Sequence, residues 1–169
     1  MILLLLSGCE KATDPGANKG ATTPTTLQQE NQAIAERLAE QKAALDSSTQ
    51  RERALAERKQ HIDSLHDISK RWVEAVGLAG RTGRSDLAGP IAKMEAIKSE
   101  LEGLAMDTCA SEGRSLLLSA INTGLEAYKQ FQQQTGAANE ALVEKLGESS
   151  KLVADSQQAL NACAAQSIS

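Results

Sequence analysis

Residues 27–79 of this 169-residue chain read LQQENQAIAERLAEQKAALDSSTQRERALAERKQHIDSLHDISKRWVEAVGLA. The segment is built mainly from Ala, Leu, Glu, Gln, Lys and Arg, which are strong helix formers. Its large apolar residues follow a heptad repeat, with Leu27, Ile34, Leu55 and Ile62 in one phase and Leu38 and Leu45 in the second. This pattern predicts one long amphipathic helix of coiled-coil type.

The apolar seam of this helix is interrupted in its middle. Gln41, Ser48, Glu52 and Lys59 occupy positions where a dry coiled-coil seam carries Leu or Ile. Residues 46–49 (DSST) are also poor helix formers. The sequence therefore allows two geometries: a continuous helix about 80 Å long at about 1.5 Å per residue, or a helix that bends near Ser48.

A second helix is predicted over residues 86–106. The first helix should stop in residues 80–84 (GRTGR), where two glycines lower the helix propensity. Ser85 or Asp86 then serves as the N-cap of the second helix, and Pro90 is tolerated near its start. The buried face of this helix is expected to carry Leu87, Ile91, Met94, Ile97, Leu101 and Leu104.

The remaining residues, 108–166, are expected to form a helical hairpin that is capped by Asp107 or Thr108 and turns at Gly136. Its first leg should bury Cys109, Gly113, Leu116, Ala120, Ile121, Gly124, Tyr128 and Phe131, with the small residues forming a strip where a neighbouring helix approaches closely. Its second leg should bury Leu142, Leu146, Val153, Leu160 and Cys163. Residues 27–169 are thus predicted to form one all-α domain, an antiparallel helical bundle with a long N-terminal coiled-coil-like helix.

The chain begins with the apolar run Ile2–Leu6, which is far shorter than the roughly 20 residues that a membrane-spanning helix needs. The sequence Leu6-Ser7-Gly8-Cys9 resembles the lipobox of bacterial lipoprotein precursors, in which an apolar residue and two small residues precede an obligatory Cys. A signal peptide normally has about 7 to 15 apolar residues behind a positive charge. We therefore expect the signal to begin upstream of Met1.

This resemblance implies that residues 1–8 are removed and that Cys9 is acylated and becomes the first residue of the mature protein. Several acyl chains hold a protein on a bilayer far more firmly than one does. Residues 9–26, with Pro, Gly and Thr but few large apolar residues, are predicted to be a flexible tether. Among Gram-negative lipoproteins an Asp after the Cys favours the inner membrane, so Glu10 favours the outer membrane, on the periplasmic side of the cell envelope.

The two other cysteines lie at equal distances from the predicted hairpin turn. Cys109 and Cys163 are each 27 residues from Gly136, so the two legs bring them level. Because the body of a lipoprotein is exported to an oxidising compartment, the resemblance favours a disulfide between them. The alternative is that both are unpaired, buried cysteines.

No catalytic, cofactor or metal site is predicted. Residues 61–67 (HIDSLHD) have metal-binding residue types, but the two histidines lie about 140° apart around a helix, and Asp63, His66 and Asp67 suit a solvated face equally well. Residues 77–83 (GLAGRTG) follow a helix and lack the Gly-Lys-Ser/Thr of a P-loop. The sequence therefore argues against an enzyme, and the segment 77–83 is expected only to connect two helices.

Charge does not indicate a partner. The chain has 18 Lys and Arg against 22 Asp and Glu, and the signs are mixed along the first helix without a basic stripe, so nucleic-acid binding is not expected.

Two kinds of function remain open. The first is a lipid-anchored, non-catalytic envelope protein whose long helix pairs with itself or with another helical protein. The second is a binding module for a small lipid or peptidoglycan fragment, with Trp72, Arg81, Arg84 and Tyr128 as candidate contacts. Trp72 is otherwise expected to be a core anchor. If the first helix is an interaction arm, residues 85–169 should fold without it, whereas a helix that belongs to the core could not be removed.

Overall fold

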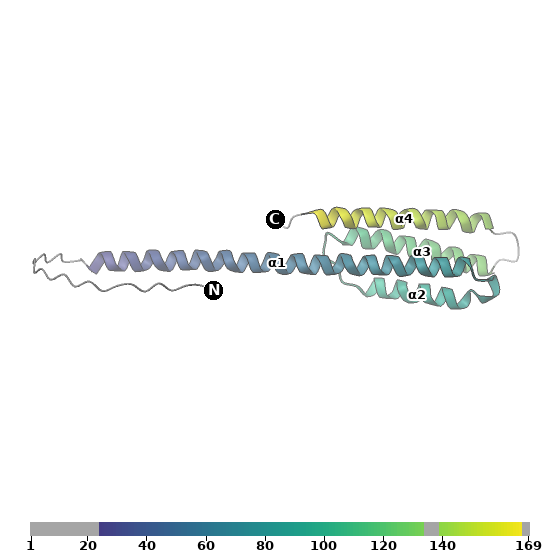
Figure 1. Ribbon diagram of the computed structural model, residues 1–169, viewed down its shortest axis with the longest axis horizontal. Helices are drawn as coiled ribbons and strands as arrows, with labels where there is room; N and C mark the ends of the chain where they lie inside the picture. The colour runs from purple at the N-terminus through teal and green to yellow at the C-terminus, as the bar shows by residue number, and fades with distance from the viewer. Residues whose placement is uncertain (1–23, 134–138, 167–169) are drawn as a thin grey trace, which may run out of the picture. The chain divides into compact units, whose positions relative to one another are not determined.

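The computed structural model describes residues 24–133 and 139–166. In these residues the regular secondary structure is all helical, which confirms the predicted fold class (Figure 1). The elements are α1 (Pro24–Gly80), the short 3-10 helix η1 (Arg84–Asp86), α2 (Ala88–Gly103), α3 (Ser111–Gln133) and α4 (Asn139–Ala165). The chain divides into two compact units between Asp46 and Ser47. We call residues 24–46 of α1 the arm, and the described residues from Ser47 onward the bundle.

α1 is one uninterrupted helix, because its backbone remains helical through residues 46–49. The helix begins at Pro24 rather than at Leu27. Proline fits the first turn of a helix because the N–H groups there have no acceptor within the helix. Residues 24–26 therefore belong to α1, whereas the rest of the predicted tether and Cys9 lie outside the described residues.

α1 ends at Gly80, within the predicted stop. The backbone N–H groups of Arg81 and Thr82 donate to the carbonyl oxygens of Leu78 and Ala79, both at 3.1 Å, and so cap the helix.

The prediction that Ser85 or Asp86 is the N-cap of α2 is wrong. Both residues lie in η1, and Leu87 takes the N-cap position without a side-chain hydrogen bond. The reason is that η1, closed by a bond from the Asp86 N–H to the Gly83 carbonyl (2.9 Å), leads directly into the helix. α2 also ends at Gly103 rather than at residue 106, because Leu104 has an extended backbone.

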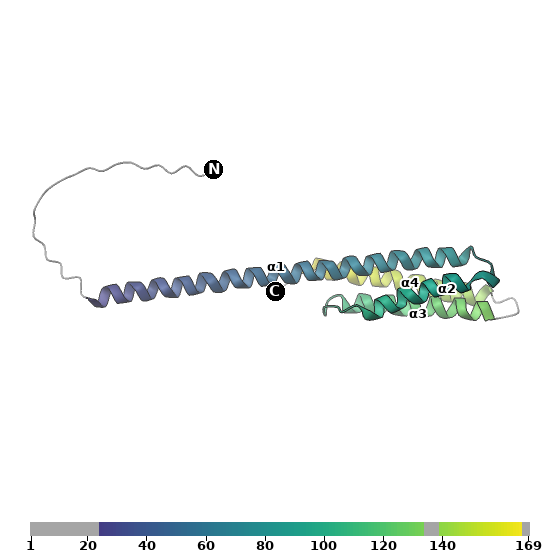
Figure 2. The same cartoon turned by 90° about the horizontal axis from the view of Figure 1, so that it is seen from below.

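The core of the bundle lies between the C-terminal part of α1 and the other three helices, which run beside it (Figure 1). Figure 2 shows the same part of α1 alongside α2 and α3. From α1 the core takes Ile62, Leu65, Ile68, Trp72, Ala75 and Ala79. A fragment of residues 85–169 would lack this wall of the core, so we expect the smallest folded fragment to begin near Ser47.

The predicted apolar faces of α2 and α4 are largely confirmed. In α2 the predicted residues within the helix are buried. Leu87, which precedes it, is buried as well, and Leu104 is partly buried. In α4, Val153, Leu160 and Cys163 are buried. Leu142 and Leu146 are only partly buried.

α3 and α4 pack closely against each other. Ser149 Oγ donates to the Ala120 carbonyl and Ser156 Oγ donates to the Gly113 carbonyl, both at 2.7 Å. The two donors are seven residues apart along α4, and their acceptors are seven residues apart in the opposite sense along α3. The helices are therefore antiparallel, as predicted, and these hydroxyl groups fix their register.

Two glycines of α3 make this close packing possible. A Cβ atom on Gly113 would lie 2.6 Å from Leu160 Cδ2, and one on Gly124 would lie 2.6 Å from Trp72 Cζ2. Within α3, Leu117 is fully buried and Leu116, the residue predicted for the core, only partly so. The difference arises because the small residues set the buried face of α3, and Leu117 follows Gly113 by four residues.

Candidate functional site

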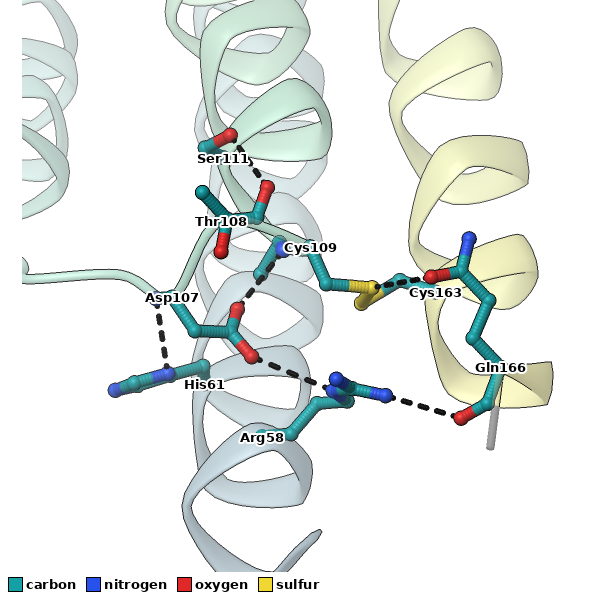
Figure 3. Close-up of polar contacts among 9 residues, drawn as sticks. Arg58, His61, Asp107, Thr108, Cys109, Ser111, Cys163 and Gln166 are labelled. Carbon is teal, nitrogen blue, oxygen red and sulfur yellow. Dashed lines mark hydrogen bonds and ion pairs between the residues drawn. A yellow bond between two sulfur atoms is a disulfide. The ribbon is translucent and has the colours of Figure 1, made fainter. Parts of the chain in front are cut away.

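The end of the bundle where α3 begins and α4 ends carries the disulfide (Figure 3). Cys109 and Cys163 are bonded, with their Cα atoms 5.5 Å apart, which confirms the predicted pairing. Their separation of 54 residues closes a loop around the hairpin. In the chain-entropy view such a bond stabilises the folded state by about 4 kcal/mol. Gly136, the predicted turn, lies outside the described residues.

A polar network surrounds this disulfide and holds the end of the bundle together (Figure 3). Asp107 Oδ1 accepts a bond from the Ala110 N–H at 2.9 Å, so Asp107 caps the turn before α3 as predicted. Its other oxygen pairs with Arg58 Nε at 3.4 Å. Arg58 Nη1 also donates to the Gln166 carbonyl at 3.0 Å. Arg58 thereby joins α1 to the ends of α3 and α4, a role that the sequence pattern did not indicate.

An open groove of about 750 Å³ lies beside the disulfide. Its charged lining residues are Arg58, Glu112 and Asp155, and the two cysteines line it as well. Arg58 already pairs with Asp107. The groove therefore presents mixed charge and no array of cations or of anions that would select a ligand.

The four candidate contact residues differ in burial, since Trp72 and Tyr128 are in the core, Arg84 is partly buried and Arg81 is exposed. Trp72 is 1% exposed and packs against Gly124, so its role as a core anchor is confirmed. The Tyr128 hydroxyl donates to the Val76 carbonyl at 3.1 Å, and burial raises the pKa of this hydroxyl. The Arg84 guanidinium lies 4.3 Å from the centre of the Phe131 ring, whereas Arg81 is exposed.

The residue types that suggested metal binding are used in other contacts. His61 Nδ1 accepts the Asp107 N–H at 3.4 Å. Asp67 pairs with Arg71 of the next turn at 2.9 Å. Within residues 24–133 and 139–166, no three His, Cys, Asp or Glu side chains gather as a metal site would require. Residues 77–83 end α1 and connect it to η1, as predicted.

One ion pair joins α1 to α2 through two hydrogen bonds. Arg71 Nη1 and Nη2 donate to the two carboxylate oxygens of Glu100 at 2.8 and 2.6 Å. These bonds lower the pKa of the Glu100 carboxyl and raise that of the Arg71 guanidinium. Both side chains are more than one-third exposed, so the pair contributes only modestly to stability.

The heptad seam of α1 has two different environments. In the bundle, Ile62 of this seam is in the core and Val76 is partly buried against it, whereas Val73 is 55% exposed. Its earlier residues have exposed fractions between 48% and 67%, and these are Leu27, Ile34, Leu38, Leu45 and Leu55. Four of these residues, Leu27, Ile34, Leu38 and Leu45, lie in the arm, and such a row of exposed apolar side chains at heptad spacing is the pattern of an interaction surface. We call these four residues of the arm the exposed seam.

In the part of the chain that the structure describes, no helix is long and apolar enough to cross a membrane. The sequence matches no known protein family, no curated protein and no solved structure.

Proposed function

We propose that this protein is a lipid-anchored, non-catalytic protein of the bacterial cell envelope whose arm binds another helix. The exposed seam is the observation that carries the proposal, because Leu27, Ile34, Leu38 and Leu45 repeat along the arm with the periodicity of a coiled coil. Burying these side chains against a second helix would remove apolar surface from water. The arm therefore offers a docking surface that does not require the bundle to open.

Two further observations support the envelope location. The lipobox-like sequence Leu6-Ser7-Gly8-Cys9 provides an acylation site ahead of the helical domain. The Cys109–Cys163 disulfide is typical of a protein that folds in an oxidising compartment such as the periplasm. With Glu10 after the acylated cysteine, we place the protein on the periplasmic side of the outer membrane.

The lipid anchor is tested by the mass of the amino-terminal peptide of protein taken from the membrane fraction of its own cells. We expect an acylated peptide that begins at Cys9. A Cys9→Ser variant should lack this peptide and should no longer be found in the membrane fraction. An unmodified peptide that begins at Met1 would remove the anchor from the proposal.

The interaction arm is tested by placing a photoreactive amino acid at residue 38 in one variant and at residue 43 in another. Leu38 lies on the exposed seam, and Ala43 lies on the opposite face of the same helix and is also exposed. Irradiation of intact cells should give a defined crosslinked product from position 38 and none from position 43. Equal products from both positions, or none from either, would contradict a docking role for the seam.

A further inference from the structure

The seam of the arm reads the same from either end. Its six positions from residue 27 to residue 45 carry Leu27, Asn31, Ile34, Leu38, Gln41 and Leu45. The order of apolar and polar residues is therefore unchanged when the helix is reversed, and the alternating spacing of four and three residues is also unchanged. A helix with this symmetry can pair with a copy of itself that runs in the opposite direction.

We propose that the binding partner of the arm is the arm of a second copy of this chain, in antiparallel orientation. This inference rests on the proposed function, because it names the partner of the same surface. In this alignment Leu27 faces Leu45 of the second copy, Ile34 faces Leu38, and Asn31 faces Gln41. Each apolar seam residue then faces an apolar residue of the second copy. Each Asn31 faces a Gln41, and the two amide side chains can hydrogen-bond to each other.

The polar half of the seam favours the antiparallel alignment. In a parallel, in-register pair, Ser48 and Glu52 would face their own copies, and the two Glu52 carboxylates would meet inside the seam. In the antiparallel pair, the helix of the second copy begins at Pro24, which lies opposite Ser48. The paired length of the two helices therefore ends where the seam becomes polar, and the two Glu52 carboxylates do not face each other.

The charged residues that flank the seam also favour the antiparallel alignment. A parallel pair would place Arg37 beside Lys42 of the second copy on both edges of the interface, which is unfavourable. The antiparallel pair has one contact between like charges, Arg37 with its own copy at the two-fold axis. Glu40, one turn further along the same helix, lies within reach of that contact and offsets it.

The surface that this pairing needs is accessible in the single chain, since Leu27, Ile34 and Leu38 are all more than half exposed. The apolar layers extend only from residue 27 to residue 45, which is less than three heptads, so association is weak and a covalent trap is the suitable readout. Leu27 and Leu45 are 18 residues apart, which is about 27 Å along a helix at about 1.5 Å per residue. A disulfide between two helices can therefore report which ends meet, because its Cα atoms must lie within about 7 Å of each other.

The experiment uses the full-length chain with Cys9→Ser and either Leu27→Cys or Leu45→Cys, purified separately and oxidised gently. Alone, neither variant should form a covalent dimer, because the two identical positions are far apart. Mixed, the two variants should form a covalent heterodimer through residues 27 and 45. Adding Ile34→Asp to both chains should abolish this dimer, and Ala43→Asp, which places the same charge on the opposite face, should leave it unchanged.

The remaining outcomes overturn the inference in different ways. Covalent dimers from each variant alone would show a parallel pair. If no dimer forms in any combination, the second copy is not the binding partner. In that case, a crosslink from position 38 to a different protein in intact cells would still uphold the proposed function, whereas the absence of any crosslink would remove both.

Discussion

The arm and the bundle part of α1 belong to one helix and both carry apolar residues at helical spacing, yet the large apolar residues of the arm are exposed, whereas those that face the other helices of the bundle are buried. Leu65 is fully buried, whereas Leu38 is 60% exposed. The helix is covered only where α2, α3 and α4 supply a facing surface. The comparison shows that periodicity in a sequence predicts an apolar face, whereas the partner of that face depends on residues elsewhere in the chain or in another molecule.

The largest expected effect comes from the same substitution in the two regions. Leu65→Ala should lower the free energy of unfolding of the bundle by about 2 to 5 kcal/mol, because it leaves a cavity among fully buried neighbours. Leu38→Ala should change it by less than about 0.5 kcal/mol, because the side chain is exposed. Urea denaturation followed by Trp72 fluorescence measures both. Equal losses would mean that the arm belongs to the cooperative core.

A smaller effect should separate tightly packed and open glycines within the bundle. Gly124→Ala should destabilise by about 1 to 3 kcal/mol, because the new methyl group would collide with the Trp72 ring and crowd Ser149. A methyl group added to Gly147 in α4 would meet no atom within 4 Å apart from its chain neighbours and the nearby backbone of its own helix, so Gly147→Ala should instead stabilise by up to about 1 kcal/mol through helix propensity. Thermal melting distinguishes the two. A neutral Gly124→Ala would show that α1 moves away from α3 at little cost.

The smallest expected effect is the pH dependence of the stability that the Arg71–Glu100 pair contributes. The folded state lowers the pKa of Glu100, so the contribution of its pair with Arg71 is present above the unfolded pKa of about 4.3. That contribution is lost as the pH falls through the lower folded pKa. Because both partners are partly exposed, we expect a difference below about 1 kcal/mol between the wild type and Glu100→Gln at pH 7. The difference should shrink in urea titrations as the pH is lowered into the acid range, and a constant difference would mean that packing accounts for it.

Much of the fold could be predicted from local patterns. The four helices, the stop at Gly80 and the capping role of Asp107 follow from helix propensity, glycine and short-range hydrogen bonding. The disulfide followed from equal spacing about the hairpin turn together with the oxidising compartment that the lipobox resemblance implies. These predictions succeeded because each depends on neighbours in sequence or on a simple antiparallel arrangement.

What could not be predicted depends on contacts between distant residues. Ser149 and Ser156 are polar and were not assigned to the core, yet they are buried because helix carbonyls of α3 accept their hydrogen bonds. Arg58 had no signal, because its partners Asp107 and Gln166 come from later in the chain. Ser85 and Asp86 have the residue types of an N-cap, but the chain turns through η1 there instead.

The seven-residue spacing of the two buried serines allows two registers of α4 against α3, and the disulfide selects one of them. Sliding α4 by one heptad would place Ser149 opposite Gly113, so that a small residue would again face a small residue. The same slide would carry Cys163 about 10 Å along the helix, beyond the reach of Cys109. Oxidation therefore selects the register of the hairpin, because the disulfide can form only in chains in which α4 has the native alignment with α3.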